Sequence, residues 1–172
     1  MSVSTSSPER YTGSGHTTGR RLELWMRPGA REGADELVTR AYSLEDDGTV
    51  ETVDVKLWHA HQDLSSPLHS RREQEARATV QSLKRWAWQH GSELLGFGDR
   101  RRAGRGRMGS EYVTQRVPPV VLVEYEDGVI VNVAPCARRE RCVTDRLVTL
   151  AKTDSNSHSN SNTASTRSRL TR

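Results

Sequence analysis

Apolar and polar residues alternate along two early segments of the chain, and this alternation is typical of β-strands. The segments are residues 21–26 (RLELWM) and residues 52–58 (TVDVKLW). Successive side chains of a strand point to opposite faces, so we expect Val53, Val55 and Leu57 to face a hydrophobic core together. The same strands carry charged residues that favour a partly open sheet face: Glu23, Asp54 and Lys56.

Three other segments carry apolar residues every three or four positions, which is the spacing of one helix face. Helices are therefore predicted from residue 34 to about residue 46, from about 71 to 90 and from about 143 to 151. The apolar face of the first helix is expected to include Tyr42. Short strands are predicted for residues 93–97 and 111–117, and residues 59–70 are predicted to form a loop.

The most apolar passage is VPPVVLVEYEDGVIVNVAPC, residues 117–136. Its unbroken apolar run at residues 120–123 predicts a strand that is covered on both faces. Residues 126–129 (EDGV) are typical of a two-residue hairpin turn, because aspartate and glycine accept the backbone angles that such a turn requires. Residues 129–133 are then expected to return antiparallel to the first strand.

This order of elements predicts a single α/β domain with a mixed sheet, β-α-β-α-(insertion)-β-β-α. Two layouts fit: a thioredoxin-like one with helices on both faces, and a ferredoxin-like one with helices on one face. The covered strand favours the first. The domain is expected at residues 20–152, with an arginine- and glycine-rich loop at 98–110. Residues 1–19 and 153–172 contain mostly small polar residues and are predicted to be disordered.

Positive charge is concentrated in the arginine- and glycine-rich loop. The chain has 26 lysines and arginines and a formal net charge of +4, and it would be close to neutral without the five arginines between residues 100 and 107. Such a cluster is expected to contact DNA or another polyanion through its phosphates, the alternative being a solvated loop. The arginines concerned are Arg100, Arg101, Arg102, Arg105 and Arg107.

Catalytic and metal-binding patterns are sparse. His59 and His61 would point the same way on an extended segment, but zinc needs three or four ligands, and we expect no metal and no cofactor. Cys136 and Cys142 lie too far apart for a zinc or redox motif, although the arginines within residues 138–141 are expected to lower a neighbouring thiol pKa. No catalytic residue is predicted, and the role is expected to be non-enzymatic.

Tryptophans offer a second kind of surface. Trp25 and Trp58 end the first two predicted strands and would lie side by side if those strands were parallel. Trp86 and Trp88 are about 200° apart on a helix, so at most one can face the core. The other would support a protein-interaction or homo-oligomerising role. No apolar run reaches the 18 residues of a membrane span, and a cytoplasmic location is expected.

Two resemblances follow from these patterns. The passage VPPVVLVEYEDGVIVNV resembles the proline and hairpin of the thioredoxin family, with Pro118 or Pro119 at the position where that family usually has a cis proline. The place of the family's redox dithiol holds RPGA, residues 27–30, so no redox activity is implied.

A second resemblance is to small proteins of extreme-halophile archaea that are labelled helix-turn-helix domain proteins. The pieces that carry it are RRLELWMR, VDVKLWHAHQDLS and EYVTQRVPPVVLVEYEDGVIVNVAPC. The resemblance implies DNA binding and transcriptional regulation. The pattern of predicted elements nevertheless contains no pair of helices joined by a turn of three or four residues, which that motif requires.

Overall fold

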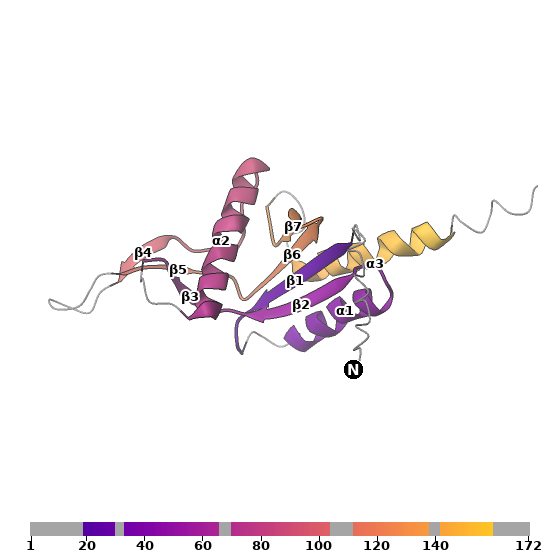
Figure 1. Ribbon diagram of the computed structural model, residues 1–172, viewed down its shortest axis with the longest axis horizontal. Coiled ribbons are helices and arrows are strands. Elements are labelled where there is room, and N and C mark those ends of the chain that lie inside the picture. Colours follow the sequence, from indigo (N-terminus) through magenta and orange to yellow (C-terminus); the bar gives the residue numbers. More distant parts are fainter. Residues whose placement is uncertain (1–18, 30–32, 66–69, 104–111, 138–141, 160–172) are drawn as a thin grey trace, which may run out of the picture.

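The computed structural model describes residues 19–29, 33–65, 70–103, 112–137 and 142–159. A four-stranded mixed sheet carries helices on both faces, and a smaller three-stranded antiparallel sheet projects from one end of it (Figure 1). The prediction of a single mixed α/β domain is confirmed. That the layout is specifically thioredoxin-like stays a prediction.

The main sheet has the strand order β2-β1-β6-β7. Strand β1 is parallel to β2 and antiparallel to β6, and β6 is antiparallel to β7. The apolar run at residues 120–123 therefore lies in an interior strand, as predicted. The bounds of the strands are Arg20–Met26 for β1, Thr52–Leu57 for β2, Val120–Glu126 for β6 and Val129–Ala134 for β7.

Three helices cover this sheet: α1 (Ala34–Asp46), α2 (Arg71–Gln89) and α3 (Val143–Ser159). Helices α1 and α3 share one face, and α2 crosses the other (Figure 1). The end of α3 differs from the prediction, because the helix continues past residue 151 into the segment expected to be disordered. A helix that has formed extends at little cost per residue, and polar side chains do not stop it.

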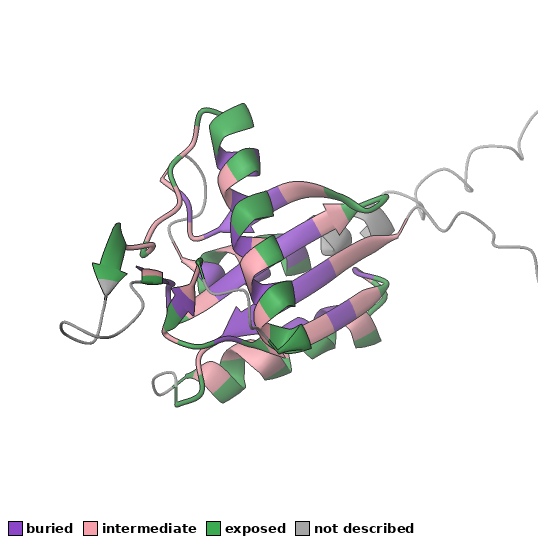
Figure 2. Ribbon diagram, turned by 60° about the vertical axis from the view of Figure 1, so that its left-hand side comes forward, coloured by how far each residue is buried: buried purple, intermediate pink, exposed green. Residues whose placement is uncertain are grey.

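Each face of the sheet has its own hydrophobic core. On the α1 and α3 side, alternate residues of β1 and β6 pack against both helices, and on the α2 side the remaining residues pack against that helix (Figure 2). Trp25 and Trp58 lie side by side beneath α2 with ring centroids 5.3 Å apart, as predicted. Trp86 is buried at 4 % exposure and Trp88 is 83 % exposed, so only one of that pair faces the core.

Two residues expected in the core are exposed. Leu57 is 44 % exposed because it is the last residue of an edge strand and has a neighbouring strand on one side only. Tyr42 is 42 % exposed. The buried residues of α1 are Ala41 and Leu44, and Tyr42 lies about 100° around the helix from Ala41, at the margin of the apolar face.

The β6–β7 turn has the predicted two-residue form, with φ of 51° at Asp127 and 77° at Gly128. Among the described residues, the cis peptide bond lies between Ala134 and Pro135. It therefore follows the hairpin, and the expectation of a cis bond at Pro118 or Pro119 was wrong.

The small sheet has the order β3-β5-β4 and was only partly predicted. Its strands are β3 (His61–Asp63), β4 (Arg100–Ala103) and β5 (Tyr112–Arg116). Strand β3 lies where a loop was expected, and β4 forms the start of the arginine-rich loop. Both depend on pairing with β5, which local residue patterns do not reveal. Residues 93–97, expected as a strand, contribute only a single bridge from Leu94 to the residues that follow β7.

Candidate polyanion-binding surface

The small sheet divides the arginine cluster between its two faces. Arg100 pairs with Gln115 and Arg101 pairs with Thr114 across the antiparallel β4–β5 ladder. Residues directly opposite each other in such a ladder point to the same side, and successive residues point to opposite sides. Arg101 therefore shares a face with Thr114, while Arg100 and Arg102 share the other face.

The face with Arg100 lies toward helix α2. Gln115 is buried there, accepts a hydrogen bond from Lys84 Nζ of α2 and donates one from Nε2 to the Gly98 carbonyl oxygen at 2.7 Å. The pKa of Lys84 is lowered, first by its burial and then by the positive charge of Arg100. Arg100 thus adds positive charge to a position that is already cationic.

The other face borders a hollow of about 440 Å³ at the junction of the two sheets. The hollow lies between the end of β1 and the outer side of the small sheet. Three arginines and a histidine line it together with one carboxylate, a hydroxyl and a glycine. The lining residues are Arg27, His61, Gly98, Asp99, Arg101, Thr114 and Arg116.

Arg27 lies at the end of β1 beside the hollow. It follows the last residue of β1, and its backbone N–H donates to the Pro119 carbonyl oxygen at 2.9 Å, which fixes the start of its side chain. The guanidinium Nε and Nη2 atoms are buried and have no hydrogen-bond partner. The pKa of Arg27 is lowered by burial and, secondly, by the charge of Arg116.

Within the described part of the chain, Arg27, Arg101 and Arg116 have no ion-pair partner, although Asp99 lines the same hollow. Removing polar N–H groups from water without a replacement hydrogen bond is unfavourable, and like charges nearby add to the cost. The arrangement is suited to an anion, which would supply acceptors and opposite charge at once.

Of the arginines proposed from sequence, Arg100, Arg101 and Arg102 lie on β4, and Arg101 alone reaches the hollow. Arg105 and Arg107 lie outside the described residues. Sequence reasoning missed Arg27 and Arg116. Each lies at the end of a strand just before a proline turn, and the antiparallel pairing of β1 with β6 brings them together. A prediction that these two strands pair would have been needed to identify Arg27 and Arg116 from the sequence.

A second polar cluster surrounds Glu23, which is only 4 % exposed. Its carboxylate accepts hydrogen bonds from Arg21 Nη1 at 2.7 Å, Trp25 Nε1 at 3.0 Å, Lys56 Nζ at 3.0 Å and Tyr125 Oη at 3.2 Å. Burial alone would raise the pKa of Glu23, but these donors and charges outweigh it and lower the pKa. A carboxylate with this many donors joins neighbouring strands, and its oxygens are occupied by protein groups and not by a ligand.

Of the three charged residues expected on a partly open sheet face, Asp54 and Lys56 have partly exposed side chains, whereas Glu23 is buried. The side chain of Asp54 is 43 % exposed and that of Lys56 is 26 % exposed, although both belong to the main sheet. Helix α2 covers the other half of the same face, over Trp25 and Trp58.

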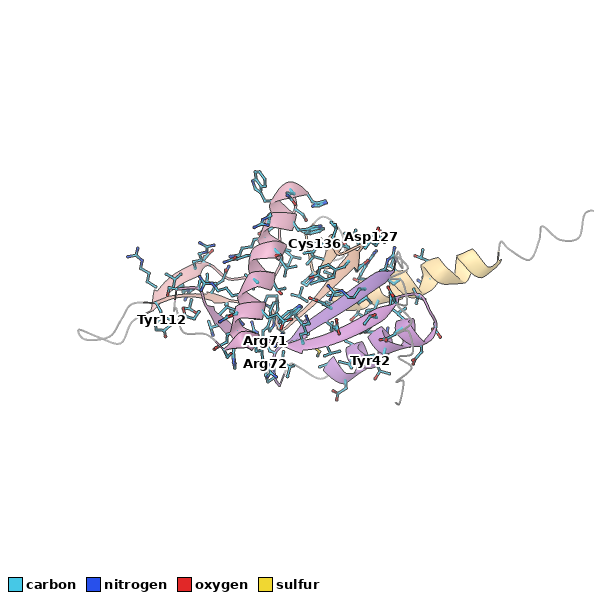
Figure 3. The ribbon with its side chains drawn as sticks, viewed as in Figure 1. Tyr42, Arg71, Arg72, Tyr112, Asp127 and Cys136 are labelled. Carbon is cyan, nitrogen blue, oxygen red and sulfur yellow. The ribbon has the colours of Figure 1, made fainter. Side chains whose placement is uncertain are left out.

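The two cysteines are free thiols, one buried and one partly exposed. Cys136 is buried and lies after β7 (Figure 3), and Cys142 accepts a hydrogen bond from the Asp145 N–H at 3.4 Å. Burial and the Asp145 carboxylate raise the pKa of Cys142, so the expectation of a lowered thiol pKa was wrong for this residue. The arginines on which that expectation rested lie in residues 138–141, outside the described residues.

His61 belongs to the hollow and not to a metal site. Across the described ranges, no group of three or more histidine, cysteine, aspartate or glutamate side chains is placed to hold a metal ion. In the same ranges, no helix is long and apolar enough to cross a membrane.

The fold and this surface define a small α/β domain with an arginine-bearing antiparallel ribbon at one end. Residues 14–155 match the helix-turn-helix domain family, and the chain belongs to that family. No curated protein and no solved structure matches the chain. In the described residues, strands separate each helix from the next, so no two helices are joined by the short turn of a helix-turn-helix motif.

Proposed function

We propose that this protein is a small, non-enzymatic regulatory protein that contacts DNA through the ribbon formed by β4 and β5. Its family description supports a DNA-binding role, while the helices of the described ranges include no recognition helix pair. The major groove of DNA admits a two-stranded antiparallel ribbon as well as an α-helix. Strand β3 ends opposite Thr114, and β4 and β5 continue beyond it as a two-stranded ribbon through the pairs Arg102–Val113 and Ala103–Tyr112. The ribbon therefore offers the missing contact element.

The observation that carries this proposal is the position of Arg100 and Arg101 on an edge strand, where neither has an ion-pair partner among the described residues. Strand β4 is the outer strand of the small sheet, and it projects from the body of the molecule (Figures 1 and 2). Arg100 and Arg101 lie on opposite faces of β4, and both are exposed. Tyr112 at the far end of β5 is 41 % exposed and adds an aromatic ring to the tip of the ribbon (Figure 3).

Arginines at consecutive positions of one strand suit phosphate contacts more than the reading of bases. Phosphate contacts position a protein on the duplex and carry no sequence information directly. We therefore propose electrostatic, largely sequence-independent binding, with a cytoplasmic location and no role for membranes. The regulatory role follows from the family description alone.

The test is the salt dependence of duplex DNA affinity, measured by fluorescence anisotropy. Changing Arg101→Gln and Arg102→Gln should lower the slope of log affinity against log salt by about one for each phosphate that the variant no longer neutralises. Arg85→Gln, on the exposed side of α2, makes the same change in net charge and should leave the slope unaltered. Equal effects of all the substitutions would mean that only net charge matters and would exclude the ribbon as the contact element.

A protein-interaction role is the second candidate, and the exposure of Trp88 favours it. A tryptophan that is 83 % exposed near the end of a helix is unusual for a residue that prefers burial. Light scattering on the wild type and on Trp88→Ala tests self-association. A monomer in both cases would exclude a homo-oligomer at this surface.

A further inference from the structure

The hollow between the two sheets has a property that DNA binding by the ribbon does not explain. Arg27 lines it, and two nitrogen atoms of its guanidinium, Nε and Nη2, are buried without a hydrogen-bond acceptor. The backbone of Arg27 is tied to Pro119, and burying N–H groups without an acceptor is unfavourable. Buried polar groups without partners in a folded domain are rare and require a physical explanation.

Arg116 and Arg101 make the cost larger. After burial, the charge of Arg116 is the second cause that lowers the pKa of Arg27, and Arg101 lines the same space from the neighbouring strand. In the described residues, carboxylates pair with the other cations of the main sheet, including Arg20, Arg21 and Lys56. The lack of such a partner therefore distinguishes the hollow from the main sheet beside it.

The size and the lining residues of the hollow indicate which kind of anion fits it. A volume of about 440 Å³ lies in the range of small-molecule pockets and exceeds what a chloride ion would fill. Guanidinium groups bind phosphate oxygens in a bidentate way, and Thr114 and His61 can add further donors. The single carboxylate in the lining, Asp99, is free to accept a hydrogen bond from a hydroxyl in the rest of a ligand.

We infer that the hollow is a binding site for the terminal phosphate of a small phosphomonoester, held by Arg27 and Arg116 with help from Arg101. Arg27, Arg101 and Arg116 line the hollow and have no ion-pair partner among the described residues, so a group that enters it meets all three charges. A terminal phosphate protrudes from its molecule and can enter. A backbone phosphate of duplex DNA lies on a convex surface and is a diester, with one negative charge fewer. This site does not depend on the proposed DNA binding.

The experiment is isothermal titration calorimetry with inorganic phosphate, adenosine monophosphate and adenosine, at an ionic strength matched with sodium chloride. Phosphate and the monophosphate should bind with one-to-one stoichiometry, and adenosine should not. Arg27→Gln and Arg116→Gln should each weaken binding by about tenfold or more, the usual effect of losing hydrogen bonds to a charged group. The control variant Arg85→Gln, on α2, should bind normally.

A structural role for Arg27 is excluded by measuring stability without ligand. If the side chain serves an anion, Arg27→Gln should unfold at the same temperature as the wild type or higher in chloride buffer, and it should lose the rise in midpoint that phosphate gives the wild type. A lower midpoint in chloride together with normal phosphate binding would overturn the inference.

Other outcomes also decide against it. No binding of phosphate or of the monophosphate above the chloride background would overturn the site. The site would equally be overturned if the Arg85→Gln control weakened binding as much as Arg27→Gln does. A DNA duplex with 5′-hydroxyl ends has no terminal phosphate. If it displaced the monophosphate from the wild type, and if Arg27→Gln no longer bound this duplex, the hollow would be a site for the DNA backbone and the phosphomonoester proposal would be overturned.

Discussion

The two ends of strand β1 carry arginines in opposite electrostatic settings. At its start, Arg20 pairs with Glu126 at 2.6 Å, and Arg21 pairs with Glu23 at 2.7 Å and with Asp54 at 3.3 Å. Just past its end, Arg27 has buried N–H groups without acceptors and a second arginine as its neighbour. The same residue type on the same strand is thus satisfied at one end and unsatisfied at the other.

This difference distinguishes charges that stabilise the fold from charges that do not. Paired charges at the start of β1 join β1, β2 and β6 to one another and support the sheet. Unpaired charges past its end contribute nothing favourable to folding, and natural proteins keep such groups mainly where a ligand uses them. Substitutions of the paired charges should therefore destabilise the protein, and substitutions of the arginines in the hollow should not.

The largest effect is expected where a paired charge is most deeply buried. Glu124 is 1 % exposed, and its carboxylate accepts hydrogen bonds from Arg146 of α3 and from Asn132 Nδ2 at 3.0 Å. Arg146→Met would leave this carboxylate with no cationic partner at a buried position, which should lower the free energy of unfolding by about 3–5 kcal/mol. Urea denaturation measures this decrease.

An exposed pair on α1 provides the control for that prediction. Arg40 and Glu36 are four residues apart on the helix surface, with an N–O distance of 2.6 Å. Arg40→Met should cost only about 0.3–0.5 kcal/mol. Similar decreases for Arg40→Met and Arg146→Met would show that burial does not set the value of a charge pair in this protein.

An intermediate effect is expected at Glu23. Glu23→Gln removes the charge that Arg21 and Lys56 face, and it should cost about 1–3 kcal/mol at neutral pH because several donors lose a charged acceptor. The pKa of Glu23 is lowered in the folded protein, so its contribution is present above the unfolded value of 4.5 and disappears as the pH falls through the folded value.

The pH dependence supplies the check on this second prediction. The difference in unfolding free energy between wild type and Glu23→Gln should be constant from pH 7 to about pH 5 and should shrink below it. Urea titrations at pH 7, 5, 4 and 3 follow this change. A difference that stays constant down to pH 3 would show that the charge of Glu23 does not stabilise the fold.

The pattern of residues predicted the main sheet well, because its strands and helices are set by local periodicity. The alternation in RLELWM and the valine run of residues 120–123 each appear in the structure as predicted, as do the β6–β7 turn and the packing of Trp25 on Trp58. Periodicity reports which face of an element is apolar, and burial follows from that. The errors concern Tyr42 and Leu57, which lie at the margin of a helix face and at the edge of the sheet. At such positions periodicity alone does not determine whether the side chain is buried.

The small sheet and the hollow could not be predicted in the same way. Strand β3 has three residues, too few to show a period, and β4 is a run of arginines whose strand character comes from its partner β5. The hollow joins residues far apart in the sequence, among them Arg27, Arg101 and Arg116. Sequence alone identified the arginine cluster by its density and could not show that alternation splits it between two faces.

The smallest effects come from the two ends of β1 themselves, and here the expected signs are opposite. Arg21→Gln should lower the free energy of unfolding by about 0.5–1 kcal/mol, because it removes two partly exposed ion pairs and a cation–π interaction with the Tyr125 ring at 4.3 Å. Arg27→Gln should leave that free energy unchanged or raise it by up to about 1 kcal/mol in chloride buffer, since it removes an unpaired charge beside Arg116. Both variants change the net charge equally, so a general charge effect cancels in the comparison.

Urea denaturation at low and high salt measures both changes in unfolding free energy, and both should become smaller at high salt because salt screens the charges. A larger decrease from Arg27→Gln than from Arg21→Gln would mean that the hollow stabilises the fold after all, and the contrast between the two ends of β1 would fail.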